Sequence, residues 1–160
     1  MNVPAEVLSQ ILDLLCEEER ALAGLLELAL KEQDALVISD FEQISSVSDR
    51  MLAAAETIEQ FESRRLNLLR STGAEAATLE ELLPLADDLG VSGFAAARLQ
   101  LVARARELRD AQEQNARLLL NAMKLRDRWA NLLGGFAAPG YGSNGRRNSS
   151  DSRGTVSRSA

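Results

Sequence analysis

The amino-acid sequence predicts an all-α protein: an antiparallel bundle of three long coiled-coil-like helices with a short helical connector and a flexible C-terminal tail. Hydrophobic residues make up 46% of the 160 residues and aromatic residues only 4%, with Leu and Ala dominating the apolar set. This composition is typical of long helices rather than sheets. Apolar side chains also recur at spacings of three and four residues, which indicates helices with one apolar face.

The first helix is predicted over residues 5–38. Its apolar face comprises Leu8, Ile11, Leu12, Leu15, Leu22, Leu25, Leu26, Ala29 and Leu36. Cys16 lies within this run and is expected to be a small buried residue. The three glutamates at positions 17–19 are expected to form a solvated acidic face, because a carboxylate metal site in a helical bundle needs histidine partners that this chain lacks.

The second helix is predicted over residues 40–71. Ser39 is expected to cap its first backbone N–H groups while Glu42 reaches back, as in a capping box. The link to the first helix is short, so the two helices should lie antiparallel. The predicted apolar face comprises Phe41, Ile44, Met51, Leu52, Ala55, Ile58, Leu66 and Leu69.

A short helix over residues 78–89 is predicted as the connector. Thr78 and Glu81 have the spacing of a second capping box, and Pro84 is expected to interrupt the helix because it lacks a backbone N–H. Ser92 is then expected to cap the third long helix, over residues 92–136. The helical bundle should span residues 1–138, followed by a flexible Gly/Ser/Arg tail at 139–160.

The third long helix has the clearest periodicity in the chain. Seven-residue repeats run through Phe94, Leu101, Leu108, Asn115, Ala122, Trp129 and Phe136, and through Ala97, Arg104, Ala111, Leu118, Leu125 and Leu132. Such a pair of repeats is the seam of a left-handed coiled coil. Asn115 replaces an apolar residue within it, which predicts a role in setting the register.

The third helix is also predicted to be longer than the other two. At 1.5 Å per residue it would measure roughly 66 Å, against roughly 50 Å for each of the others. Since it starts where the second helix ends, we expect it to extend past them by roughly ten residues. Its apolar C-terminal end would then have no partner within the chain, which predicts a surface for binding another protein or for self-association.

Charge is distributed unevenly along the chain. Residues 1–62 hold 14 acids and 3 bases, whereas residues 98–128 hold 8 bases and 4 acids. An acidic first helix and a basic third helix should therefore attract each other. The whole chain has a net charge of −6, which argues against a general nucleic-acid binder.

Several function classes are disfavoured by what the sequence lacks. It contains no histidine and one cysteine, so His-dependent nucleophile pairs, His-ligated zinc and internal disulfides are excluded. We therefore expect no metal site and none of these His- or Cys-dependent catalytic sites. No signal peptide and no apolar run long enough to span a membrane is visible, which predicts a cytoplasmic protein without membrane insertion.

Several stretches of the sequence resemble the FlgN-type flagellar type III export chaperones. Residues 14–22 (LLCEEERAL), 32–36 (EQDAL) and 39–42 (SDFE) occur in the family's order, and residues 111–133 resemble its last helix. Tyr141, Gly142 and Gly145 match a Tyr-Gly-x-x-Gly element that often closes these proteins. The resemblance covers about residues 5–146 and rests on order and spacing more than on any single motif.

This resemblance implies that the protein is not an enzyme and has no catalytic residues and no cofactor. It implies a chaperone that binds the C-terminal helical segments of the hook–filament junction proteins FlgK and FlgL and delivers them to the export gate. It also implies that the end of the last helix binds the substrate. The implied substrate-facing residues are Leu118, Leu119, Leu125, Trp129, Leu132 and Phe136. Tyr141 is the implied contact for the gate component FlhA, although the Gly134–Pro139 stretch breaks the helix before it.

Two other interpretations remain open at this point. A coiled-coil structural or adaptor protein could form a homodimer through the same helix end and would stay a dimer whatever is added. An RNA-binding helix pair would use the basic residues between Arg98 and Arg109 together with Arg126 and Arg128, and its affinity would fall steeply with salt.

Overall fold

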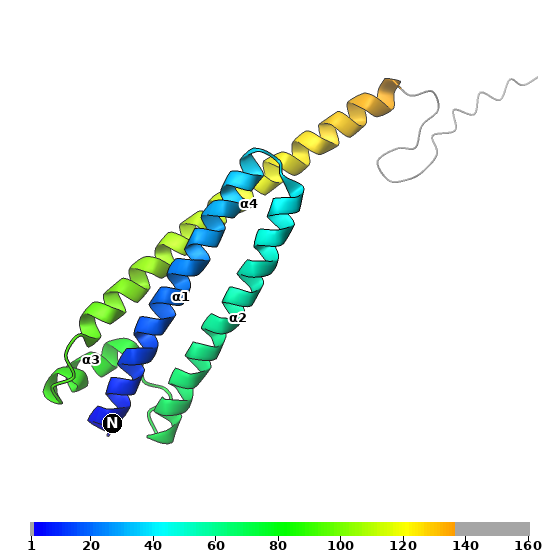
Figure 1. Ribbon diagram of the computed structural model, residues 1–160. Coiled ribbons are helices and arrows are strands. Elements are labelled where there is room, and N and C mark those ends of the chain that lie inside the picture. The colour runs from blue at the N-terminus through cyan, green and yellow to red at the C-terminus, as the bar shows by residue number, and fades with distance from the viewer. Residues whose placement is uncertain (1, 137–160) are drawn as a thin grey trace, which may run out of the picture. The chain divides into compact units, whose positions relative to one another are not determined.

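The computed structural model describes residues 2–136 and confirms the all-α prediction, with no strand in that range (Figure 1). Its helices are α1 (Ala5–Val37), α2 (Phe41–Ser71), α3 (Leu79–Asp88) and α4 (Phe94–Phe136). The chain divides into two units, Met1–Leu118 and Leu119–Ala160, each described by itself below. The expected tail lies outside the described residues, so the division at residue 138 stays a prediction.

Helices α1 and α2 form a hairpin with a tight connection. The N–H of Asp40 donates to the carbonyl of Ala35 at 2.9 Å, while Ser39 adopts a left-handed φ of 57°. The side chain that caps α2 is Asp40, which accepts from the N–H of Gln43 at 3.1 Å. The predicted cap at Ser39 was therefore wrong, because Ser39 serves the end of α1 instead.

The ends of α2 and α3 use the same type of turn with glycine. Gly73 and Gly90 have φ values of 72° and 73°, a conformation that costs glycine little because it has no Cβ. In each turn the following N–H reaches back to a carbonyl in the helix, from Ala74 to Leu69 and from Val91 to Ala86. The chain thus turns sharply where α2 ends and again where α3 ends.

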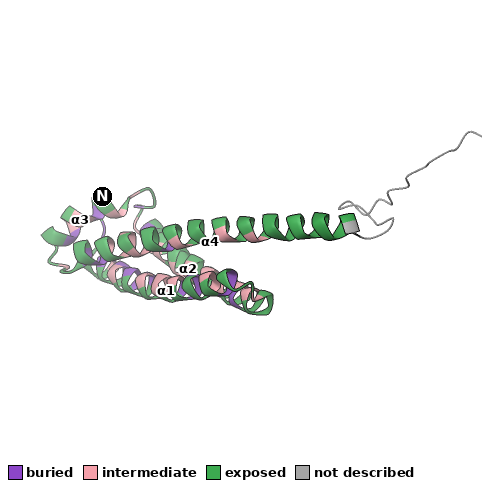
Figure 2. Ribbon diagram, turned by 90° about the horizontal axis from the view of Figure 1, so that it is seen from above, coloured by how far each residue is buried: buried purple, intermediate pink, exposed green. Residues whose placement is uncertain are grey.

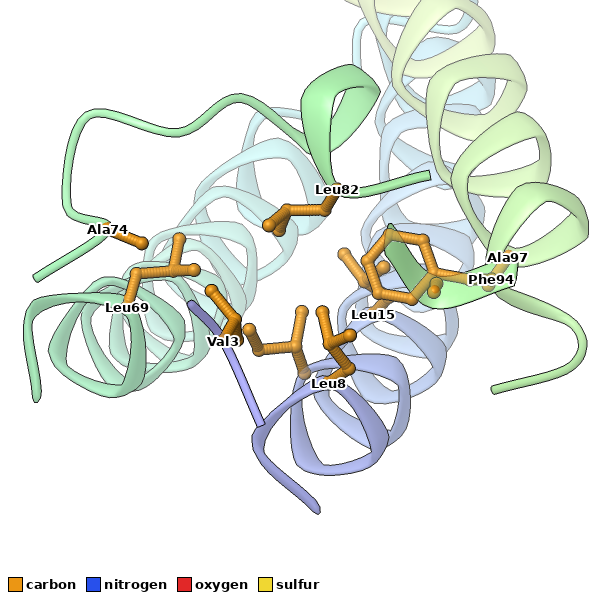
Figure 3. Packing of buried hydrophobic residues seen from close by; sticks show 10 residues of the cluster. Val3, Leu8, Leu15, Leu69, Ala74, Leu82, Phe94 and Ala97 are labelled. Carbon is orange, nitrogen blue, oxygen red and sulfur yellow. The ribbon is translucent and has the colours of Figure 1, made fainter. Parts of the chain in front are cut away.

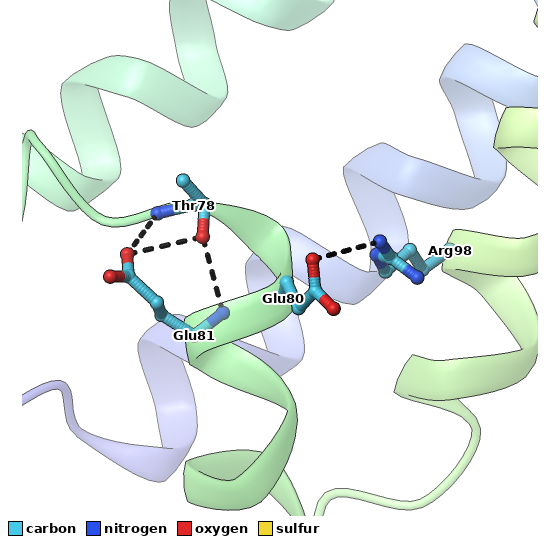
Figure 4. A network of polar contacts seen from close by, with 4 residues as sticks. All are labelled: Thr78, Glu80, Glu81 and Arg98. Atoms are coloured by element: carbon cyan, nitrogen blue, oxygen red, sulfur yellow. Dashed lines mark hydrogen bonds and ion pairs between the residues drawn. The ribbon is translucent and has the colours of Figure 1, made fainter.

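The start of α3 confirms the predicted capping box (Figure 4). The N–H of Thr78 donates to a carboxylate oxygen of Glu81 at 2.8 Å, and the N–H of Glu81 donates to Oγ1 of Thr78 at 3.3 Å. In the same first turn, Glu80 pairs with Arg98 of α4 at 3.5 Å. Pro84 does not interrupt α3, contrary to the prediction, and α4 starts at Phe94, two residues after Ser92.

The main hydrophobic core joins α1, α2, α3 and the start of α4 (Figure 3). Burial of each large side chain there contributes about 1.5–3 kcal/mol. The core consists of Val3, Leu8, Ile11, Leu15, Leu69, Ala74, Leu82, Ala86, Phe94 and Ala97. Farther along, Leu25 and Ala29 of α1 pack with Leu108 of α4 in a second cluster. The predicted apolar face of α1 thus lies in the core.

The apolar face predicted for α2 is only partly buried. Leu69 is buried, but Phe41 and Leu52 are each 67% exposed and Leu66 is exposed as well. Along α2 the buried side chains are Val47 and Leu69. The periodicity therefore predicted the helix correctly but overestimated how much of it is covered.

The glutamate triad of α1 also differs from the prediction of a solvated face. Glu18 is only 5% exposed, and its carboxylate accepts a hydrogen bond from Nε of Arg65 in α2 at 3.1 Å. Glu19 accepts from Nε of Arg104 in α4, also at 3.1 Å, and this bond raises the pKa of the guanidinium. Cys16, expected to be buried, is exposed.

We predict that replacing one partner of the Glu18–Arg65 pair destabilises the fold, whereas replacing both costs little stability. Arg65→Met should lower the free energy of unfolding by about 3 kcal/mol, because it leaves a buried carboxylate without its cation. Adding Glu18→Met should recover most of that loss, since two flexible apolar side chains fill a similar volume. Urea unfolding followed by circular dichroism measures both, and a double variant as unstable as the single one contradicts the prediction.

We also predict that acid loosens the start of α3 through Glu81. The hydrogen bond from the backbone of Thr78, followed by that from its side chain, lowers the pKa of the Glu81 carboxyl. The ionised carboxylate therefore stabilises the fold above its ordinary pKa of 4.5, and this contribution is lost as the pH falls through the lower value in the folded protein. Glu81→Gln should remove this part of the pH dependence. The amide shift of Thr78, titrated by NMR in both proteins, tests it.

Candidate functional site

The seven-residue seam of α4 is covered along its first part and exposed along its last part (Figure 2). Phe94, Leu108 and Asn115 are buried. From residue 119 to residue 135 every side chain is exposed except the half-buried Ala122. The repeat in the sequence continues unchanged across this point, so the loss of cover does not reflect a more polar helix face.

A buried polar layer marks the last covered turn. The side-chain amide of Asn115 donates to the carbonyl of Ala29 at 2.8 Å and to the carboxylate of Glu32 at 3.1 Å. The other carboxylate oxygen of Glu32 accepts from the hydroxyl of Ser48 in α2 at 3.0 Å. Oδ1 of Asn115 is buried and has no hydrogen-bond partner among the described residues. The layer connects α1, α2 and α4 through one side chain from each.

The last turns of α4 carry an apolar stripe along one face. At about 100° per residue, positions 122, 125, 129 and 132 lie within about 40° of a common line and span roughly 15 Å. We call these positions the C-terminal stripe: Ala122, Leu125, Trp129 and Leu132. Leu125, Trp129 and Leu132 are each more than half exposed, at 56%, 55% and 52%. Such a contiguous exposed face is unusual unless something binds it.

The binding residues implied by the family resemblance do not all lie in the part of the chain that the structure describes. Leu118, the last residue of the first unit, is half-buried, while Leu119, Leu125, Trp129 and Leu132 are exposed. Phe136 ends α4, and its side chain lies outside what is described, as does Tyr141. The structure therefore leaves the roles of these residues as predictions.

Other exposed apolar residues of the same helix segment were not anticipated. Leu120, Met123 and Leu133 are exposed and lie off the seven-residue repeat. The run of three leucines at 118–120 was the available signal, because three consecutive residues cannot all face one helix. Leu119 and Leu133 flank the C-terminal stripe on one side and widen it.

The charges beside the C-terminal stripe are mainly positive. Between residues 119 and 135 the chain has Lys124, Arg126 and Arg128 against a single acid, Asp127. Arg126 approaches Asp127 at 3.9 Å, but both side chains are about 70% exposed, so this pair contributes little. In the heptad from Ala122 to Arg128, the two positions directly beside the stripe, called e and g, are Arg126 and Arg128.

Elsewhere along residues 2–136 the helices present fewer features of a binding site. No group of three metal-ligating side chains comes together there. An open groove between α1 and α2, lined by Asp13, Glu17 and Arg64 among others, holds no buried titratable group. None of the described helices is long and apolar enough to cross a membrane.

A helical chain whose longest helix presents an uncovered apolar stripe belongs to the class of proteins that can bind other helices. The family model described as FlgN protein matches residues 1–149. The chain therefore belongs to the FlgN family of flagellar export chaperones. No curated protein and no solved structure matches it significantly.

We predict that the C-terminal stripe contributes little to folding. Leu125→Ser combined with Leu132→Ser should lower the free energy of unfolding by less than about 1 kcal/mol, because both side chains are already in water. Leu8→Ala, at a fully buried position of α1, should cost about 2–5 kcal/mol and serves as the comparison. A loss in the stripe variant as large as that of Leu8→Ala would show that the stripe is covered in the free chain.

Proposed function

We propose that this flagellar export chaperone binds the C-terminal helical segments of the junction proteins FlgK and FlgL through the C-terminal stripe of α4, in the cytoplasm. It then delivers them to the flagellar type III export gate. Family membership supports the chaperone role and the hook-associated class of partner. The proposal assigns the chain no catalytic residue, metal or cofactor.

One observation carries the assignment of the site: the seam of α4 keeps its apolar repeat past residue 118 while its burial ends there. A helix from another protein, docked on the stripe, would bury Leu125, Trp129 and Leu132. Helix-in-groove recognition uses such i, i+4, i+7 anchors. A segment that is unfolded when free loses conformational entropy on docking, which keeps the affinity moderate and release feasible.

We also propose that the three long helices form a bundle with antiparallel neighbours. Contacts between pairs of helices support this bundle: a tight turn joins α1 to α2, and α1 contacts α4 through Glu19 with Arg104 and through Ala29 with Asn115. In such a bundle α1 holds the first part of the α4 seam, and the stripe stays available to the substrate.

Docking on the gate component FlhA is assigned to Tyr141. Tyr141 begins the family's Tyr-Gly-x-x-Gly element, which follows α4 by a few residues in the sequence. The substrate-binding stripe and the gate contact would then be neighbours along the chain but distinct, so that substrate release need not precede docking.

The alternative is a non-enzymatic coiled-coil adaptor that forms a homodimer through the C-terminal end of α4. The same stripe supports it, because a second copy of α4 presents an identical apolar face. The two differ in stoichiometry: the chaperone becomes 1:1 with its substrate, whereas the adaptor stays a dimer.

We predict that a C-terminal segment of FlgK binds this protein 1:1 in a calorimetric titration. The Leu125→Ser/Leu132→Ser variant, or a chain ending at Asn131, should weaken binding at least tenfold, because each loses apolar area buried on docking. Leu52→Ser in α2, at a leucine that is 67% exposed, is the control and should bind like the unaltered chain.

Three results would contradict this assignment. Absence of binding to either junction protein removes the substrate proposal. Equal loss with Leu52→Ser shows that the stripe is not the site. A dimer that persists at saturating FlgK segment, measured by light scattering, favours the adaptor.

A further inference from the structure

The first part of the α4 seam shows what kind of helix covers it. Between residues 94 and 118 the seam packs against α1, α3 and part of α2, and α1 brings leucine and alanine to it along most of this length. Helix α1 also brings carboxylates: Glu19 binds Arg104, and Glu32 binds Asn115. The part of the cover that α1 provides is thus an apolar helix face with acidic side chains directed at α4.

The uncovered part has its basic residues beside the seam, whereas Arg104 of the covered part lies within it. Within the heptad from Ala122 to Arg128, the two positions that face a partner's edges in a coiled coil are both arginine, Arg126 and Arg128. Arg128 pairs with no carboxylate among the described residues, and Arg126 has only the long contact with Asp127. Both cations are therefore available to a docked helix.

We infer that the C-terminal stripe selects an amphipathic helix with acidic residues beside its apolar face, an intermolecular counterpart of α1. The inference rests on the proposed function, since it specifies the substrate class of the same site. A helix with basic edges would place like charges against Arg126 and Arg128 and would be rejected. Charge thus gives the stripe a selectivity that leucines alone cannot provide.

The test exchanges the charges on both sides. Two synthetic peptides of about five turns carry identical leucines at the seam positions and differ only in having Glu or Lys at the flanking positions. The unaltered chain should bind the Glu peptide at least tenfold more tightly than the Lys peptide, because exposed ion pairs each change the affinity a few-fold. Arg126→Glu with Arg128→Glu should reverse this order, and the difference should shrink as salt is raised.

The matched control is Arg106→Glu with Arg109→Glu. These arginines are exposed on the same helix but lie on heptad positions that point away from the seam. The control changes the net charge by the same amount and should leave the peptide preference intact. If both double variants shift the preference equally, the effect is one of net charge and the inference is wrong.

The FlgK segment separates this inference from the proposed function. If it binds the unaltered chain and the Arg126→Glu/Arg128→Glu variant equally well, the charge selection is overturned and the chaperone site stands. If it fails to bind while the Glu and Lys peptides still exchange preference, the selection stands and the substrate proposal fails. Equal binding of both peptides to the unaltered chain overturns the inference directly.

Discussion

Apolar side chains that recur every seven residues along a helix leave a stripe in water unless another helix covers it. In this protein that constraint falls on α4, the longest helix, with 43 residues against 33 in α1. Its first part is covered by α1 and by the α3 connector, whose cap and ion pair place Phe94 in the core. Its last part carries the same repeat without cover. The candidate function follows from this difference along one helix.

The polar layer at Asn115 separates the two parts and has a thermodynamic cost. Oδ1 of Asn115 has no hydrogen-bond partner among the described residues, and a buried oxygen left so costs about 1–3 kcal/mol. This cost offsets part of what the two hydrogen bonds of its amide contribute. The amide also fixes the register of α4 on α1, because it binds Ala29 and Glu32 together. A seven-residue repeat alone permits slippage by one heptad, and the layer disfavours it.

Much of the fold could be predicted from the sequence, because local rules determine it. The apolar face of α1, the capping box at Thr78 and the all-α class follow from periodicity and side-chain chemistry. The errors arise where the burial of a side chain depends on residues that are distant in the sequence. Glu18 lies seven residues from both Ile11 and Leu25 and so belongs to the buried face, but only the position of Arg65 in the fold allows a carboxylate there. Phe41 and Leu52 have helical spacing yet no neighbour to cover them.

The cap at Asp40 shows a similar limit. Ser39 and Asp40 are both good capping residues, and the choice depends on how α1 ends. Because Ser39 takes the left-handed position that closes α1, the next residue must cap α2. For the candidate site, the sequence predicted the surface through helix lengths and the repeat, but the flanking exposed residues Leu120 and Met123 needed the structure.

A chaperone that delivers its substrate must also release it, and the end of α4 suits that requirement. Gly134 and Gly135 lie within the last turn of the helix, where each lowers helix stability by about 1 kcal/mol relative to alanine. Under the proposed function, holding this turn in place would offset part of the energy gained by covering Trp129 and Leu132. Binding would then be weaker than the apolar area alone gives, and dissociation would be correspondingly faster. The proposed selectivity of Arg126 and Arg128 would discriminate between partner helices more than it would raise affinity, since ion pairs at an exposed edge are individually weak. A stripe with large anchors, a weak helical end and charged edges would thus combine specific capture with release.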